Sequence, residues 1–447
     1  MPHGEAHEPQ PIEPSSAADT RGGRSYPWLW VPSLYFVQGL PFVLVVNVSV
    51  ILYENLGLTN KEIAEYTSYL YLPWVIKPLW SPIVDVLGAK RRWIVNLQFL
   101  MGLALVGIAW AVTAESFVFW TLAWFFLLAF GSATHDIAAD GFYMAAQSPH
   151  QQALYVGIRS TFYRLAMVAG SGLLVMLVDW LTKRGYEPAA AWRGGLLFTA
   201  ALLVAMTAYH ALVLPRPARD RAQASTSYSR VLAEIGDTFV TFFAKKDLAV
   251  TLAFLLLYRF AEGQLVKIAP PFLLKERGLG GLGLDTGQVG FAYGVVGVTL
   301  LLAGGILGGL AAARYGLRSC LPWMVIAINV PNVVYLALAY WQPMQIWLVH
   351  LAVGIEQFGY GFGFAAYLLY MLYIARGDHE TAHYAICTGF MALGMMLPGW
   401  ISGRAQEALG YTGFFTWILL ATIPSFIVAG IVYLKMDPQF GRRETTT

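Results

Sequence analysis

The sequence predicts an all-α polytopic membrane protein with twelve transmembrane helices, arranged as two pseudo-symmetric sets of six. Three observations support this fold class: a charge-poor composition, twelve long apolar segments, and motifs that repeat after the sixth segment. Of the 447 residues, 57% are hydrophobic and only 12% are charged, whereas a soluble chain is about 25% charged. With a net charge of only +3, this composition excludes an ordinary soluble enzyme, a disordered chain and a nucleic-acid-binding protein.

The apolar segments define the elements in order. A membrane-spanning helix needs about 20 mostly apolar residues. Twelve segments meet this length, at residues 30–53, 63–87, 93–114, 117–146, 152–179, 192–214, 248–274, 288–313, 320–341, 345–375, 382–407 and 411–435. The longest break follows the sixth segment. The expected organisation is a disordered cytoplasmic tail (1–26), an N-terminal six-helix bundle (27–214), a cytoplasmic linker (215–247), a C-terminal six-helix bundle (248–436) and a cytoplasmic tail (437–447).

The distribution of basic residues predicts the orientation. Most of the 29 Lys and Arg residues fall in the loops on the side that holds the N-terminus, and loops rich in Lys and Arg face the cytoplasm. Both termini are therefore expected in the cytoplasm. The first apolar segment is longer than the core of a signal peptide and lacks a small-residue cleavage site, so we expect it to remain as a membrane helix. Cys320 and Cys387 form no CxxC motif.

Two motifs recur at equivalent positions in the two sets of segments. After the second segment, residues 81–92 (SPIVDVLGAKRR) combine a small residue, Asp85, a glycine and a basic run. After the eighth segment, residues 309–318 (GLAAARYGLR) keep this spacing but have alanine in place of the aspartate. Sequences typical of capping boxes, at 59–62 (TNKE) and 285–288 (DTGQ), begin the second and eighth segments. Such a repeat predicts two related six-helix bundles in the same orientation.

Several of these strings resemble a known family. Residues 81–92 resemble the loop motif of the major facilitator superfamily, which in that family helps to hold the cytoplasmic side closed. Further strings resemble the AmpG-like permeases, relatives of the acetyl-CoA transporters: GLPF at 39–42, LPWVIKPLWSP at 72–82, SATHDIAAD at 132–140, YRL at 163–165, and LYR at 257–259 with Glu262. The resemblance covers about residues 30–435. It implies a proton-coupled secondary transporter of the bacterial inner membrane that works by alternating access.

The resemblance also implies a substrate class. The expected solute is anionic and medium-sized, with a muropeptide (an anhydro-sugar peptide) as the first choice, and the transporter is expected to import it. A siderophore or acyl-CoA-type permease of the same fold is the alternative, because the group also includes siderophore-type permeases. A membrane enzyme ranks below both. The expected partners are the lipid bilayer, the solute and protons, with a monomeric chain, no nucleic acid and no cofactor.

Charged residues inside the apolar segments mark candidate functional sites, because each costs about 2.5–3.5 kcal/mol on insertion scales. One group is expected near mid-depth: Arg164, Arg259, Glu262, Glu356 and the adjacent Gln357. In the family that the chain resembles, segments one, four, seven and ten line the cavity and segment five flanks it. We expect the two arginines to hold an anionic part of the solute and the two glutamates to take up protons. A local ion pair is the alternative for Arg259 and Glu262.

A second charged group lies nearer the cytoplasmic ends of the segments: Lys77, Asp85, Asp136, Asp140 and Arg159, with Lys90, Arg91 and Arg92 in or beside the adjoining loop. Asp136 and Asp140 are four residues apart and therefore share one helix face. Two ionised carboxylates there repel each other unless a cation intervenes or one is protonated. Two hypotheses follow: a structural gate that seals the cytoplasmic side, or one aspartate that carries the coupled proton.

The remaining features of the segments have structural interpretations. Lys267 is expected to extend its ammonium towards the membrane surface. Helix packing is the first interpretation of the tyrosines and glycines of segments eight and ten, with sugar stacking as the alternative for the tyrosines: Gly304, Gly305, Gly308, Gly309, Gly359, Gly361, Gly363, Tyr360, Tyr367 and Tyr370. Prolines are expected to break segments two and seven: Pro73, Pro78, Pro82, Pro270 and Pro271. His135 beside Asp136 is a poor set for catalysis or metal binding, so no catalytic or metal site is expected.

Overall fold

The computed structural model describes residues 26–81, 84, 89–147, 149–217, 220, 228–376 and 380–437. Within these residues all regular secondary structure is helical, and ten helices are long and apolar enough to cross a membrane. One of the ten, His383–Lys435, is 53 residues long and contains two spans, because Gly410 turns the chain with φ 66° and ψ 176°. Predicted segment two supplies the remaining span as a broken helix. The predicted all-α fold with twelve spans is confirmed.

Helices α1 to α10 form the first six spans, which we call the N-half. Three spans are interrupted by short π-helical or 3₁₀ pieces or by turns, and three are continuous. In order the pieces are α1 (Pro27–Val43), η1 (Leu44–Val48) and α2 (Ser49–Asn55); α3 (Asn60–Tyr69), α4 (Leu72–Ile76) and η2 (Lys77–Leu79); α6 (Lys90–Ala111); α7 (Phe117–Ala146); α8 (Pro149–Met167), η3 (Val168–Leu174) and α9 (Val175–Lys183); and α10 (Pro188–Val213).

Helices α12 to α20 form the last six spans, which we call the C-half. The pieces are α12 (Leu248–Leu257) and α13 (Phe260–Leu274); α14 (Thr286–Phe291), η5 (Ala292–Gly297) and α15 (Val298–Tyr315); α16 (Leu317–Asn329), η6 (Val330–Asn332) and α17 (Val333–Trp341); α18 (Ile346–Ala375); α19 (Glu380–Ala421); and α20 (Ile423–Lys435). A 3₁₀ turn, η4 (Arg277–Leu279), follows α13, and α11 (Tyr228–Phe243) lies between the halves in sequence.

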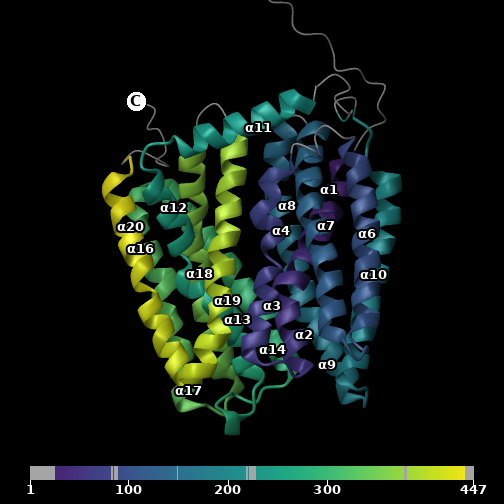
Figure 1. Ribbon diagram of the computed structural model, residues 1–447, viewed down its shortest axis with the longest axis vertical. Helices are drawn as coiled ribbons and strands as arrows, with labels where there is room; N and C mark the ends of the chain where they lie inside the picture. The colour runs from purple at the N-terminus through teal and green to yellow at the C-terminus, as the bar shows by residue number, and fades with distance from the viewer. Residues whose placement is uncertain are drawn as a thin grey trace, which may run out of the picture.

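The two halves stand side by side, with α11 across one end of the bundle (Figure 1). We call this the linker end, and the opposite end, where α9 and α17 lie, the distal end (Figure 1). The expected domain boundaries stay a prediction. Most of the two expected tails, at 1–25 and 438–447, and much of the linker, at 218–219 and 221–227, lie outside the described residues.

Both predicted capping boxes are present, at equivalent positions of the two halves. The Thr59 hydroxyl accepts the Glu62 N–H at 3.2 Å, and the Glu62 carboxylate accepts the Thr59 N–H at 2.9 Å. At the start of α14, Asp285 accepts the Gln288 N–H at 2.7 Å and donates its own N–H to the Gln288 side chain at 3.0 Å. Each box satisfies two N–H groups that a helix start leaves free, which fixes where spans two and eight begin.

The helix breaks agree with the prolines in one span and disagree in another. Span two is broken as predicted: α3 ends at Tyr69, and α4 with Pro73 passes into the 3₁₀ turn that holds Pro78, while Pro82 lies outside the described residues. In span seven the prediction is wrong. The break falls at Arg259, between α12 and α13, and α13 runs through Pro270 and Pro271 to Leu274. Pro270 and Pro271 are among the last five residues of α13, so the backbone hydrogen bonds that they remove do not interrupt the span at mid-length.

Glycines bring α15, α16 and α18 into close contact, as predicted, except at Gly309, where a Cβ would meet no described atom within 4 Å. A Cβ on Gly304 of α15 would overlap the carbonyl of Phe358 in α18. On α18, a Cβ on Gly361 would overlap Leu301 of α15, and a Cβ on Gly359 would overlap Ala327 of α16. These glycines therefore serve helix packing, where small residues allow close approach of backbones.

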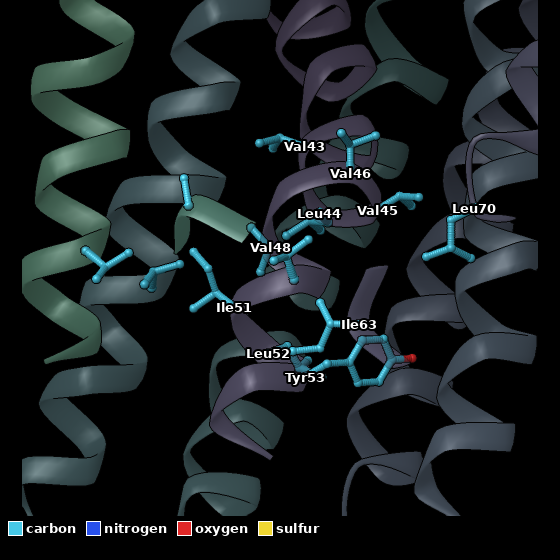
Figure 2. Close-up of a cluster of buried hydrophobic side chains, with 14 of the residues drawn as sticks. Val43, Leu44, Val45, Val46, Val48, Ile51, Leu52, Tyr53, Ile63 and Leu70 are labelled. Carbon is cyan, nitrogen blue, oxygen red and sulfur yellow. The ribbon is translucent and has the colours of Figure 1, made fainter. Parts of the chain in front are cut away.

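The apolar core is shared by the halves towards the distal end and separate towards the linker end. One cluster joins N-half residues of η1 and α2, shown in Figure 2, to C-half residues such as Ile268 and Phe415. A second cluster contains only residues of α11 and the C-half, and a third only residues of the N-half, including Trp30 and Phe142. The halves are therefore held together by apolar packing over the distal part of their length.

Candidate functional site

Arg259 occupies the break in span seven and is surrounded by aromatic rings. Its side chain is buried, and its guanidinium donates a hydrogen bond to the Tyr360 hydroxyl. The guanidinium carbon lies 5.2 Å from the centre of the Tyr360 ring and 4.8 Å from that of Phe364, both within cation–π range. These rings stabilise the charge without neutralising it, so Arg259 remains a cation available to an anion.

Glu262 lies one turn further along α13 and is also buried. Its Oε2 has no hydrogen-bond partner among the described residues, and neither has the Nε of Arg259. The local ion pair considered for these two residues is not formed; the Arg259 guanidinium donates to the Tyr360 hydroxyl instead. The site thus presents one buried donor and one buried acceptor that the described residues leave unsatisfied.

Glu356 on α18 differs from Glu262 in having its hydrogen bonds in place. It is 2% exposed. Its Oε2 accepts a hydrogen bond from the Gln357 amide at 2.9 Å and from the Tyr335 hydroxyl at 3.4 Å. Tyr335 in turn shares a hydrogen bond of 2.7 Å with Tyr293. Glu356 is therefore held in place by side chains of three spans of the C-half.

Arg164 brings the N-half to this cluster. It lies on α8, and its Nη2 would be 3.7 Å from a Cβ on Gly305 of α15. Tyr360 is close enough to Arg164, Arg259, Glu262 and Glu356 to interact with their charges. The structure thus gathers the four charged residues predicted at mid-depth near Tyr360, and the fifth, Gln357, is hydrogen-bonded to Glu356. We call these five residues and Tyr360 the central cluster. Their roles in transport stay a prediction.

The predicted repulsion between Asp136 and Asp140 is relieved because each has its own cation. Asp136 lies 3.7 Å from Lys77 and accepts the Trp74 indole N–H at 3.3 Å. Asp140 pairs with Arg159 at 2.7 Å and accepts the Tyr35 hydroxyl at 3.1 Å. All of these residues belong to the N-half and connect its first, second, fourth and fifth spans. Asp85, predicted to join them, lies outside the described residues.

The three basic residues at the start of α6 take separate positions. The backbone N–H groups of Lys90 and Arg91 donate to Asp220 at 2.7 and 3.0 Å, which places a carboxylate at a helix N-terminus, where the helix dipole favours it. The Arg91 guanidinium donates to Leu214 and Ala211 carbonyls at the end of α10. The Lys90 side chain packs on Gly141, next to Asp140, and Arg92 is exposed.

Lys267 is the residue that the sequence interpretation placed wrongly. Instead of reaching the membrane surface, its side chain is 0% exposed, and its Nζ donates to the Thr67 hydroxyl of α3 at 2.9 Å. The ring of Tyr71 lies 5.0 Å away. The hydrogen bond joins residues 200 positions apart, so no local pattern could reveal it. Tyr335 was missed for the same reason, since it meets Glu356 only through the fold.

The tyrosines of α18 separate into two groups. The Tyr367 hydroxyl donates to the Leu255 carbonyl at 2.5 Å, and its ring stacks on Phe254 with 5.8 Å between centroids. Tyr370 packs on the same ring at 4.4 Å. Packing, the first interpretation of these two residues, agrees with the contacts. Tyr360 instead belongs to the central cluster.

Ion pairs connect the halves at the distal end. Glu54 lies 3.5 Å from Lys275, Lys183 lies 2.9 Å from Asp285, and Glu65 lies 2.6 Å from Arg404. The Asn60 amide adds hydrogen bonds to Gln406 at 2.6 Å and Tyr411 at 2.9 Å. Together with the shared apolar core, these contacts close the distal end.

Two six-span halves around a buried charged cluster define a secondary transporter, and the sequence comparisons identify its family. The sequence model of the Major Facilitator Superfamily matches residues 33–397. The chain therefore belongs to this family, as the motifs predicted. It is a multi-pass membrane protein that transports a small-molecule solute. Because the family consists of transporters, the prediction that the chain is not an enzyme is confirmed.

Individual relatives place the chain within the family. It is 25% identical over 403 residues to the anhydromuropeptide permease of Escherichia coli (strain K12), across 88% of this chain and 77% of the permease. It resembles the structure of the nucleoside transporter NupG with a TM-score of 0.64 and 16% identity, over 91% of this chain and 98% of NupG. A D-xylose-proton symporter matches with a TM-score of 0.67 and 14% identity, over 93% and 98%. The structural matches establish the fold.

Proposed function

We propose that the chain is a proton-coupled importer of an anionic, medium-sized solute in the bacterial inner membrane, and that this solute is an anhydromuropeptide. One observation carries the proposal: the buried Arg259 Nε and Glu262 Oε2 have no partner among the described residues. Buried polar groups are ordinarily hydrogen-bonded, so an unsatisfied donor and acceptor at the centre of a transporter suit a ligand. The relationship to the anhydromuropeptide permease supports the choice of solute.

The roles follow from charge and hydrogen bonding. Arg259, and Arg164 from the other half, hold the carboxylate of the solute through paired N–H donors. Glu262 binds the coupled proton, since a buried carboxyl group with a free oxygen can hold one. Glu356 is fixed by Tyr335 and Gln357 and acts on Glu262 through its charge. Tyr360 offers an aromatic face beside the cations for a sugar ring.

The closed distal end fits one state of an alternating-access cycle. In the orientation that the basic loops predict, the linker end faces the cytoplasm, so this state would release solute inward. The breaks at residues 70–71 and at Arg259 interrupt spans two and seven next to the central cluster. Such interruptions can absorb the changes in backbone angles that a hinge needs.

Reconstituted vesicles provide the test. We expect the purified chain to accumulate radiolabelled anhydromuropeptide when the outside is more acidic than the inside, and to stop when an ionophore removes the proton gradient. A ferric siderophore and acetyl-CoA serve as competitors that address the alternative substrates. Muropeptide uptake that does not depend on the proton gradient would contradict proton coupling. Binding of a siderophore or of acetyl-CoA, with no uptake of muropeptide, would contradict the proposed solute and favour the alternative.

A further inference from the structure

A fully buried lysine lies between the halves, outside the central cluster. Lys267 is on α13 of the C-half, and its Nζ donates to Thr67 of α3 in the N-half at 2.9 Å. Eight residues separate it from Arg259, which is about 12 Å along a helix, in the direction of the distal end. Lys267 therefore lies between the central cluster and the distal ion pairs.

In the part of the chain that the structure describes, the Lys267 ammonium has no acidic partner. No carboxylate of the described residues forms an ion pair with it, and its hydrogen bond goes to the neutral Thr67 hydroxyl. The Tyr71 ring, 5.0 Å away, stabilises the cation only in part. Burying an ammonium without a counter-charge is strongly unfavourable, so an anion that reaches Lys267 in another conformation would be bound favourably.

A second unsatisfied group lies beside it. The Ser68 hydroxyl is fully buried and has no hydrogen-bond partner among the described residues. A Cβ on Gly399 of α19 would lie 2.7 Å from the Ser68 Oγ and 3.4 Å from the Lys267 Cγ, so both side chains pack on the same glycine. The stem of Lys267 and the Ser68 hydroxyl thus lie against the same glycine, where α3 of the N-half contacts α13 and α19 of the C-half.

We propose that Lys267 and Ser68 form a capture subsite that binds a carboxylate of the solute when the distal end is open. Opening removes Thr67 from Lys267 and exposes the ammonium to solute entering from that side. The bound carboxylate then supplies the counter-charge that the described residues do not provide. Closing returns Lys267 to Thr67 and leaves the solute to Arg259. This inference rests on the proposed function and extends it by assigning the step before the central cluster.

The test compares Lys267→Met with the wild type on two solutes: an anhydromuropeptide and the same compound with its carboxylates amidated. We expect Lys267→Met to raise the KM of the acid form about tenfold with kcat within about twofold, and to leave the KM of the amidated form unchanged. Lys267→Arg, which keeps a cation, should recover most of the affinity. Lys435→Met, which removes a lysine at the linker end, is the matched control.

Two results would overturn the subsite. One is an unchanged KM for the acid form, and the other is an equal loss for acid and amidated forms, which is what a purely structural lysine predicts. A second measurement, which needs no solute, tests the subsite even if the Lys267→Met variant folds poorly or the wild type does not transport muropeptide. In a chain with Cys320→Ala and Cys387→Ala, Lys267→Cys should react with an impermeant anionic thiol reagent from the distal side. A cysteine at 267 that never reacts from that side contradicts the subsite even if the proposed transport is correct.

Discussion

Glu262 and Glu356 are both buried carboxylates, but their hydrogen-bond partners differ, and with them their capacity to take up a proton. Glu356 accepts hydrogen bonds from Gln357 and Tyr335, so protonation would disturb an arrangement that is already satisfied. Glu262 keeps a free Oε2 and lies beside the cation that we expect to bind solute. At the scale of single residues, Glu262 is therefore the better candidate for the proton carrier. The sequence shows two acidic residues at mid-depth but does not distinguish between them.

We predict that Glu262→Gln abolishes uptake driven by a proton gradient but preserves exchange of labelled for unlabelled solute. Glutamine resembles a permanently protonated glutamate, so the site can still bind solute and change conformation. Glu356→Gln should reduce both activities by less than about tenfold, since the amide keeps part of the hydrogen bonding. Vesicle uptake and exchange measure the two activities, and exposed Glu115→Gln is the control. Normal gradient-driven uptake by Glu262→Gln would mean that a residue other than Glu262 binds the coupled proton.

Asp136 and Lys77 allow a test of the two hypotheses for the second charged group. Removing one member of a mostly buried ion pair costs about 3–5 kcal/mol, whereas replacing both with apolar residues is often neutral. We predict that Lys77→Met lowers the thermal stability of the purified protein and that Lys77→Met combined with Asp136→Leu restores it. If the pair is structural, transport returns with stability. Restored stability without proton-driven uptake would instead make Asp136 a coupling residue.

Charged residues show best what a sequence can and cannot reveal at this scale. Their rarity in apolar segments was enough to predict the central cluster, because the cost of each charge marks it. The rarity of these charges could not show which residues they contact. Lys267 was expected at the membrane surface, but the structure gives it Thr67, 200 residues away. Whether a cation reaches water or a neighbouring helix depends on which spans are adjacent, and hydropathy does not encode that.

At the scale of elements, the length of a span could be predicted from hydropathy, but the position of the break in span seven could not. Segment four, predicted at 117–146, coincides with α7, because a bilayer sets the length of an apolar helix. The break at Arg259 has no proline at the site. At this break the Arg259 guanidinium donates to Tyr360 of α18. The break therefore coincides with a contact to another span, which the sequence of span seven alone does not show.

Adjacent glycines on α15 provide a matched test of helix packing. A Cβ on Gly308 would lie 2.6 Å from the carbonyl of Phe362, whereas a Cβ on Gly309 would meet no atom of the described residues within 4 Å. We predict that Gly308→Ala destabilises the protein by about 1–3 kcal/mol through overpacking. Gly309→Ala should be neutral or stabilise by up to about 1 kcal/mol, because alanine is the better helix former. Thermal unfolding in detergent compares them, and equal effects would contradict the close contact between α15 and α18.

At the scale of the whole molecule, the structure adds a conformational state to the predicted fold. The repeat of six and six spans and the family could be inferred from motifs, since the capping boxes and loop strings lie at equivalent positions. The sequence could not show which end is closed, because the same sequence adopts every conformation of the transport cycle. The answer comes from contacts between distant segments: the shared apolar core and the distal ion pairs, against separate cores at the linker end.

The distal ion pairs lead to a prediction about this equilibrium. Partly exposed pairs contribute about 0.2–1 kcal/mol each, so losing Glu54–Lys275 and Glu65–Arg404 together should favour distal opening by about 1 kcal/mol, or roughly fivefold. In a chain with Cys320→Ala and Cys387→Ala, Ser402→Cys reports opening, because Ser402 is fully buried and lies between Gly399 and Gly403, which both contact α3.

We predict that Glu54→Gln combined with Glu65→Gln increases the reaction of this cysteine with an impermeant thiol reagent about fivefold. Raising the ionic strength should increase the reaction of the parent protein and have less effect on the double variant, since salt screens exposed charges. Glu187→Gln, an exposed substitution at the same end, controls for charge. Unchanged reactivity would mean that the apolar core holds the distal end closed and that opening must await solute at Lys267 or a proton at Glu262.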